Sequence, residues 1–130
     1  MELHAPDYII LLIDDLERSL TFYTQVLGLR LGHRSGEYAQ LDTGPTRLGL
    51  YTRRAMAQVV GVPLHPPALD APGCELGFKV PDVDAAFAAL TARGATATTP
   101  PTTRPWGQRT AYIRDPDGHL IELVQDIGKP

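Results

Sequence analysis

Apolar and polar residues follow the same order twice along the chain. In each copy an apolar run, Tyr8–Ile13 or 76–80, is followed by an aspartate and by apolar residues at helical spacing. Residues 13–20 parallel residues 80–87 at an offset of 67 positions. Self-similarity at a fixed offset is typical of a repeated structural unit. The pattern therefore predicts two copies of one strand–helix module.

Each copy places an aspartate and a glycine at the two ends of its predicted helix. Asp15 and Asp82 precede the helical spacing, where a carboxylate accepts hydrogen bonds from free backbone N–H groups. Gly28 and Gly94 follow it, where helices commonly end on a left-handed residue. We therefore predict two equivalent helices, each capped by its aspartate and ended by its glycine.

After each helix, apolar residues alternate with polar ones, which is the spacing of half-buried strands. The strands expected from this alternation are 29–34, 37–42 and 46–52 in the first copy, and 95–99, 108–114 and 119–125 in the second. A short helix is expected over 54–60, and Asp115–Gly118 has the composition of a tight turn. The fold class is thus α+β, with two tandem β-α-β-β-β modules whose mixed sheets curl around a shared concave groove.

The length of 130 residues suits a single domain. We expect module one over about 5–60, a Pro-rich linker over 61–73 and module two over about 74–126. The first apolar run has six residues, far short of a membrane span or of a signal peptide's apolar core. These features predict a cytoplasmic protein with no membrane partner.

Charge and cysteine content exclude several classes of site. Twelve Lys and Arg face fifteen Asp and Glu, giving a net charge of −3. A nucleic-acid binder needs a basic surface, so no nucleic-acid partner is expected. Cys74 is the one cysteine, which excludes an internal disulfide and a Cys-rich zinc site. We expect Cys74 to be a small buried apolar residue.

Strand alternation separates a fully apolar face from a mixed one. In the first strand, Leu11 and Ile13 share one face while Tyr8 and Ile10 share the other. The mixed faces, expected to line the groove, carry Tyr8, Arg47, Gly49, Tyr51, Glu75, Gly77, Lys79 and Glu122. Polar groups on otherwise apolar inner faces indicate a groove filled by water or a ligand.

Two motifs resemble the vicinal oxygen chelate superfamily. Asp15–Tyr23 is Asp-Leu-Glu-Arg-Ser-Leu-Thr-Phe-Tyr, and Trp106–Leu123 joins Trp-Gly to Asp-Pro-Asp-Gly-His-Leu-Ile-Glu-Leu. That superfamily includes glyoxalase I, extradiol dioxygenases, fosfomycin-resistance enzymes and the metal-free bleomycin-resistance proteins. The resemblance covers nearly the whole chain and is closest in motif to the bleomycin-resistance-like branch. It implies the paired-module fold and a homodimer, with the groove built within one chain or across two.

The resemblance also implies where a metal ion would bind. Enzymes of the superfamily place ligands on the first and last strand of each module, typically His or Gln, Glu, His and Glu. The matching positions here are Tyr8, Gly49, Glu75 and Glu122. Two carboxylates suit zinc, iron or nickel poorly, because these ions favour imidazole. We expect no cofactor, and a water-rich Mg²⁺ or Mn²⁺ on the two glutamates is the alternative.

Three residues have more than one interpretation. Glu122 could pair with a side chain such as Lys79, contact a ligand or bind a metal ion. Trp106 could stack on a planar ligand, as in bleomycin-resistance-like relatives, or anchor the Pro-rich loop expected over 100–105. Arg47 could pair with an anionic ligand or with a glutamate. His119 is expected to be an exposed or capping residue.

These observations favour a metal-independent protein that sequesters a planar or aromatic small molecule, such as an antibiotic or a metabolite. The ligand-binding residues expected are Tyr8, Arg47, Tyr51, Glu75, Trp106 and Glu122. One alternative is a glyoxalase-like lyase or isomerase, or a dioxygenase-like enzyme. It would use a divalent metal, or Glu75 or Glu122 as a general base. Another alternative is a ligand-sensing or structural module.

Overall fold

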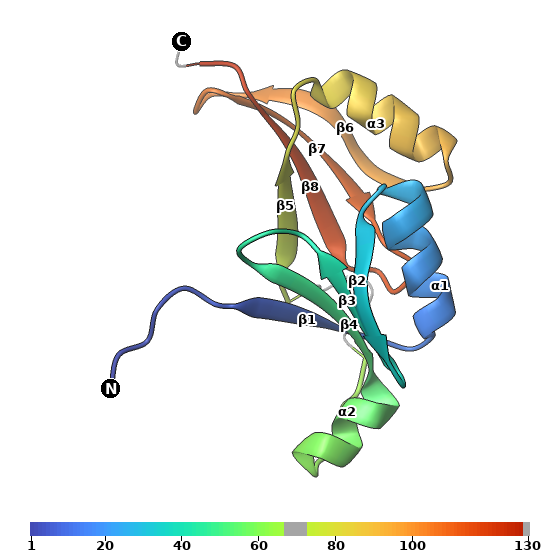
Figure 1. Ribbon diagram of the computed structural model, residues 1–130. Coiled ribbons are helices and arrows are strands. Elements are labelled where there is room, and N and C mark those ends of the chain that lie inside the picture. Colours follow the sequence, from blue (N-terminus) through green and yellow to red (C-terminus); the bar gives the residue numbers. More distant parts are fainter. Residues whose placement is uncertain (67–72, 129–130) are drawn as a thin grey trace. The chain divides into compact units, whose positions relative to one another are not determined.

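The computed structural model describes residues 1–66 and 73–128, so residues 67–72 of the expected linker lie outside the described part. The chain divides into two compact units, residues 1–66 and 67–130. Each unit contains one mixed four-stranded sheet (Figure 1). The predicted α+β fold of two β-α-β-β-β modules is confirmed.

The first unit begins with strand β1. Its elements are β1 (Tyr8–Ile13), α1 (Leu16–Thr21), the π-helical turn η1 (Phe22–Val26), β2 (Arg30–Ser35), β3 (Tyr38–Asp42), β4 (Arg47–Thr52) and α2 (Arg53–Val60). The strand order is β1-β4-β3-β2, in which β1 runs parallel to β4 and the other neighbours are antiparallel. The first strand of the module, β1, thus pairs with its last strand, β4.

The second unit repeats this topology. Its elements are β5 (Glu75–Lys79), α3 (Val83–Ala92), β6 (Thr96–Arg104), β7 (Gln108–Arg114) and β8 (Leu120–Asp126), in the order β5-β8-β7-β6. Even the register agrees, because Ile10 pairs with Gly49 as Gly77 pairs with Glu122. Gly49 and Glu122 therefore occupy equivalent places, as the repeat predicts.

Local signals set the helix ends. The Asp15 carboxylate accepts a hydrogen bond from the backbone N–H of Arg18 at 3.1 Å, and Asp82 accepts one from Ala85 at 3.1 Å. Gly28 and Gly94 lie just beyond the helices with φ of 80° and 106°, a conformation that L side chains disfavour. Both predicted caps and both predicted ends are confirmed. In the described part of the chain, no helix is long and apolar enough to cross a membrane.

Each sheet buries the face that its helix covers. In the first unit α1 contacts β3 and β4, and the buried apolar side chains include Leu11, Ile13, Leu41, Leu48 and Leu50. In the second, α3 lies across β6, β7 and β8 over Ala111, Ile113, Ile121 and Leu123 (Figure 1). The opposite faces carry the mixed residues, as strand alternation predicts.

Strand β6 differs from the expectation. The predicted strand ended at residue 99 and gave way to a Pro-rich loop over 100–105, whereas β6 continues to Arg104. Pro100 and Pro101 are tolerated because β6 is the last strand in the order of its sheet, and its register with β7 shifts between Thr99 and Thr102. Trp106 consequently lies in the tight turn between β6 and β7.

Candidate functional site

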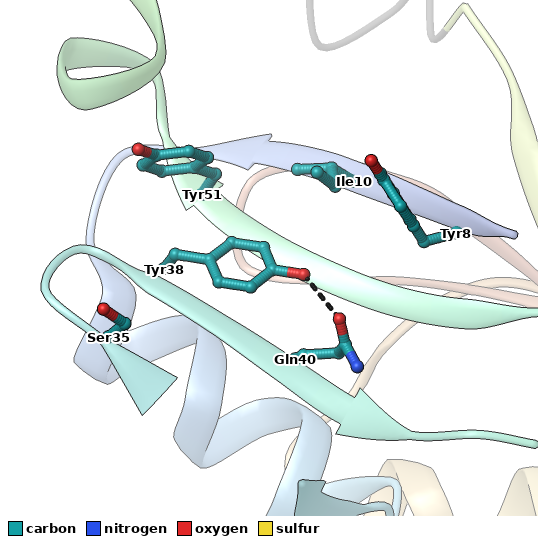
Figure 2. A pocket seen from close by; sticks show the side chains of 6 residues that line it. All are labelled: Tyr8, Ile10, Ser35, Tyr38, Gln40 and Tyr51. Carbon is teal, nitrogen blue, oxygen red and sulfur yellow. Dashed lines mark hydrogen bonds between the residues drawn. The ribbon is translucent and has the colours of Figure 1, made fainter. Parts of the chain in front are cut away.

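The open face of the first sheet forms a tyrosine-lined pocket of about 450 Å³. Three of its strands and the end of the fourth contribute side chains, namely Tyr8, Ile10, Ser35, Tyr38, Gln40 and Tyr51 (Figure 2). Two of the predicted ligand-binding residues, Tyr8 and Tyr51, thus lie on one face. The sequence did not single out Tyr38 or Gln40, which lie on the same face of β3.

Tyr38 lies over Gly49, its diagonal neighbour on β4. A Cβ atom on Gly49 would stand 2.8 Å from Tyr38 Oη and 2.9 Å from Tyr38 Cε1. These distances are shorter than real Cβ contacts, so any larger residue would displace the ring. Gly49 does not have a positive φ. Its lack of a side chain therefore makes room for Tyr38.

The Tyr38 phenol is fixed by its neighbours. Its hydroxyl donates a hydrogen bond to Gln40 Oε1 at 3.0 Å, and its ring meets the Tyr51 ring edge-on with centroids 5.4 Å apart. Burial raises the pKa of Tyr38, Tyr8 raises it further, and the Arg47 cation opposes them. The phenol therefore stays protonated at neutral pH and remains able to donate.

Arg47 starts β4 opposite Tyr8 and is exposed. The pocket lining does not include it. Its effect on the pKa of Tyr38 shows that its charge reaches the pocket. The predicted contact between Arg47 and a ligand stays a prediction.

The open face of the second sheet carries the two predicted glutamates. Glu122 accepts a hydrogen bond from the Tyr112 hydroxyl at 2.7 Å, between side chains paired across β7 and β8. Its other oxygen lies 3.5 Å from the position of a Cβ atom on Gly77. Because the phenol donates, Glu122 is held as an acceptor on a half-buried surface.

Glu122 does bond to a neighbouring side chain, which was one of its three interpretations, but the partner is Tyr112 and not Lys79. Lys79 Nζ lies 2.5 Å from Asp126 Oδ2 instead. In register, Lys79 stands opposite Val124, which places the ammonium nearer the end of β8 than its centre. Lys79 and a hydrogen bond from Gln108 lower the pKa of Asp126. Lys79 thus forms its ion pair with Asp126 at the end of the sheet, and it does not compensate the negative charge of Glu122.

Glu75 and Glu122 influence each other electrostatically. Burial raises the pKa of Glu75, and the negative charge of Glu122 raises it further. The hydrogen bond to Glu122 raises the pKa of Tyr112, with burial and both glutamates adding to the effect. The second sheet therefore presents an anionic surface that favours a donor or a cation.

Trp106 is 62% exposed, yet its indole is held in place. Its Nε1–H donates to Gln108 Oε1 at 3.0 Å, and Gln108 Nε2 donates to Asp126 Oδ1 at 3.1 Å. Gln108 shares its strand face with Tyr112, so the indole is tethered at one end of the open face. This arrangement leaves the ring free to stack. The convergence of Trp106 and both sheets on one groove stays a prediction.

The residues at the metal positions do not match a transition-metal site. Tyr8, Gly49, Glu75 and Glu122 occupy equivalent register positions in the two sheets. Gly49 supplies no donor atom, and Tyr38 fills the space that its side chain would need. Within residues 1–66 and 73–128, no three His, Cys, Asp or Glu side chains gather as metal ligands do. The donor chemistry therefore does not fit a superfamily metal ion.

Two expectations about other residues need correction. His119 is neither exposed nor a cap, because its ring Nδ1 lies 2.7 Å from the buried carboxylate of Asp115. Asp115 also accepts hydrogen bonds from the backbone N–H groups of Asp117 and His119, and so closes the turn into β8. Cys74 is exposed rather than buried, since it precedes β5 outside the packed face.

A family model described as the Glyoxalase/Bleomycin resistance protein/Dioxygenase superfamily matches residues 5–123. The chain is 37% identical to the uncharacterized protein YraH of Bacillus subtilis (strain 168) over 121 residues, which are 88% of this chain and 93% of that one. A probable lactoylglutathione lyase of Vibrio cholerae is 30% identical over 132 residues, which cover 97% of this chain and 94% of that one. The crystal structure of a glyoxalase/bleomycin resistance protein/dioxygenase from Nocardioides superposes with a TM-score of 0.86 at 27% identity. It covers all of this chain and 89% of that one.

Proposed function

Because this chain belongs to the glyoxalase/bleomycin resistance protein/dioxygenase superfamily, we propose that it binds a planar or aromatic small molecule without a metal ion. In this proposal it sequesters an antibiotic or a metabolite, as bleomycin-resistance-like members do. The observation that carries the proposal is Tyr38 over Gly49. An aromatic ring occupies the position where a metalloenzyme would place a carboxylate.

Each open face carries groups that suit such a ligand. Tyr8, Ile10 and Tyr51 supply apolar and aromatic walls on the first sheet. Glu75 and Glu122 supply negative charge on the second, and Trp106 supplies an exposed ring. Ligand sites commonly combine apolar walls with a few placed polar groups.

The test is a calorimetric titration of metal-free protein with a panel of bicyclic and tricyclic aromatic compounds. The protein is first dialysed against a chelator, and its metal content is measured. We expect binding that the chelator does not weaken and that Tyr38→Ala reduces at least tenfold, because it removes a wall of the pocket. Val59→Gln, on the exposed side of α2, is the matched control. Loss of binding on dialysis, or its restoration by added metal, would contradict the proposal.

The raised pKa of Glu75 favours a second candidate function. A carboxyl group whose pKa moves toward neutrality is better suited to act as a general base. The similarity to a probable lactoylglutathione lyase gives this candidate a reaction class. The measurement is turnover of lactoylglutathione by metal-free protein, with Glu75→Gln and Glu122→Gln as variants. Turnover that both substitutions abolish would support the enzyme over the binding protein.

A further inference from the structure

Tyr38 and Gln40 form one hydrogen bond with each other. Together they keep one hydrogen-bond acceptor and one hydrogen-bond donor group for a ligand. The Tyr38 hydroxyl donates its hydrogen to Gln40 Oε1 at 3.0 Å. The phenol oxygen keeps a lone pair, and the Gln40 amide nitrogen keeps its two hydrogens. Figure 2 shows this nitrogen on the side of the amide away from Tyr38. The pair therefore presents one acceptor and one donor to the same pocket.

This property does not depend on which way the amide faces. Turned by 180°, Gln40 would donate to the phenol oxygen, and the pair would then present the phenol hydrogen and the amide oxygen. In both orientations the pair presents one donor and one acceptor. The protonated state of Tyr38 follows from its raised pKa, which burial dominates.

The walls around the pair restrict the shape of a ligand. The Tyr51 ring stands 5.4 Å from the Tyr38 ring at an interplanar angle of 63°, and Ile10 and Tyr8 line the same pocket. Aromatic and aliphatic walls favour a flat apolar body. A ligand that fits has a planar ring system with its polar groups on one edge.

We propose that the Tyr38–Gln40 pair binds the cis-amide edge of a planar lactam or imide, in which a ring N–H lies beside a carbonyl oxygen. The inference rests on the proposed function and names its ligand class. A lactam matches both remaining groups, because its N–H meets the acceptor and its carbonyl meets the donor. A carboxylate brings two acceptors and an amidinium brings two donors, so each leaves one pocket group unpaired.

The experiment compares three probes on the wild-type protein by ligand-detected NMR: 2-quinolinone, 1-methyl-2-quinolinone and 2-aminoquinoline. The pH is kept below the pKa of 2-aminoquinoline, so that its ring nitrogen is protonated and this probe presents two donors. Methylation blocks the lactam N–H while the ring and carbonyl remain. We expect 2-quinolinone to bind about tenfold more tightly than its N-methyl derivative, because one hydrogen bond is lost and one acceptor is left unpaired.

Gln40→Glu distinguishes recognition from a purely structural role. The glutamate keeps an acceptor for Tyr38 and replaces the amide donor with a second acceptor, so the pair then suits two donors. Relative to wild type, we expect the preference for 2-aminoquinoline over 2-quinolinone to rise at least tenfold. Val59→Gln, on the exposed side of α2 and outside the pocket lining, is the control. It should leave both preferences unchanged.

The outcomes separate this inference from the proposed function. Equal affinity for 2-quinolinone and its N-methyl derivative, or an unchanged preference in Gln40→Glu, would overturn the lactam assignment while planar-ligand binding stands. Failure of all three probes and of the wider aromatic panel to bind would overturn both. A tenfold preference that Gln40→Glu shifts and Val59→Gln keeps would support the assignment.

Discussion

The Tyr38 ring occupies the volume that a side chain at Gly49 would need, with Oη only 2.8 Å from the position of a Cβ atom. Tyr38 borders an open pocket, so its ring can move aside at modest cost. We expect Gly49→Ala to lower the free energy of unfolding by about 1 kcal/mol, at the low end for overpacking. Ligand affinity should fall as well, since the pocket wall moves. Urea unfolding and calorimetry measure the two effects.

A double-mutant cycle identifies the cause. In a Tyr38→Ala background the ring is gone, so Gly49→Ala should cost less, with the Ile10 contact at 3.1 Å remaining. Equal costs in both backgrounds would show that Tyr38 does not restrict residue 49.

Helix ends give a direct test of the repeated module. Asp82→Ala removes the acceptor for the Ala85 N–H and should cost about 1 kcal/mol of unfolding free energy. Asp15→Ala should cost a similar amount, since Asp15 holds Arg18 in the same way. A negligible change in either variant would show that the capping bond does not contribute.

Gly94→Val tests the end of α3. Gly94 has φ of 106° with no atom within 4 Å of an added Cβ, so any cost comes from backbone strain. We expect a loss of more than about 1 kcal/mol, because a β-branched residue is strained there. Gly73→Ala, with open space and no positive φ, is the control and should be nearly neutral. Similar losses at both positions would contradict the strain argument.

The fold could be predicted because its signals are local and repeated. Asp15 and Asp82 cap helices through residues three positions away, and strand alternation assigns Leu11 and Tyr8 to opposite faces. The second copy provides an independent instance of the same signals. The offset between copies also placed Gly49 and Glu122 at equivalent positions, as the register shows.

The side-chain partners could not be predicted, because they depend on pairing between strands distant in sequence. Tyr112 meets Glu122 only through the β7–β8 register. Tyr38 reaches Gly49 only through the pairing of β3 with β4. A tyrosine and a glutamine two residues apart in a strand gave no local signal of a pocket.

Pro100 led to a wrong prediction of a loop. Its preference for loops is overridden at the edge of a sheet, where it is part of β6.

Glu75 should make stability depend on pH. Burial and the charge of Glu122 raise the pKa of Glu75 in the folded protein. A raised pKa means that its stabilising contribution is complete below its ordinary pKa of 4.5 and is lost as pH rises through the folded value. We expect Glu75→Gln to raise the unfolding midpoint slightly at pH 7, with no gain at pH 3.5. The effect is small because Glu75 is exposed and solvent screens it.

The Glu122→Gln background provides the control for this pH effect. Without the neighbouring charge, the gain from Glu75→Gln should shrink to the part that burial causes. High salt should reduce the gain in the wild-type background. A gain that persists at pH 3.5 would point to packing rather than ionisation.

Trp106 should report ligand binding by its fluorescence. It is the one tryptophan in the chain, and its indole is tethered to Gln108 while its ring is exposed. Stacking of a planar ligand would quench or shift its emission. We expect planar compounds to change the Trp106 emission in a saturable way. Compounds that bear an ammonium group should bind more tightly than those that do not, and Glu122→Gln should reduce this preference several-fold.

Two further variants separate stacking from general proximity. Trp106→Phe, followed by calorimetry, keeps an aromatic ring of smaller area and should weaken binding a few-fold. Gln108→Leu keeps the indole but removes the acceptor that holds it, so it should weaken binding less while broadening the emission response. Equal affinity of the panel for wild type, Trp106→Phe and Glu122→Gln would remove both residues from the ligand site. The tyrosine pocket of the first sheet would then account for binding by itself.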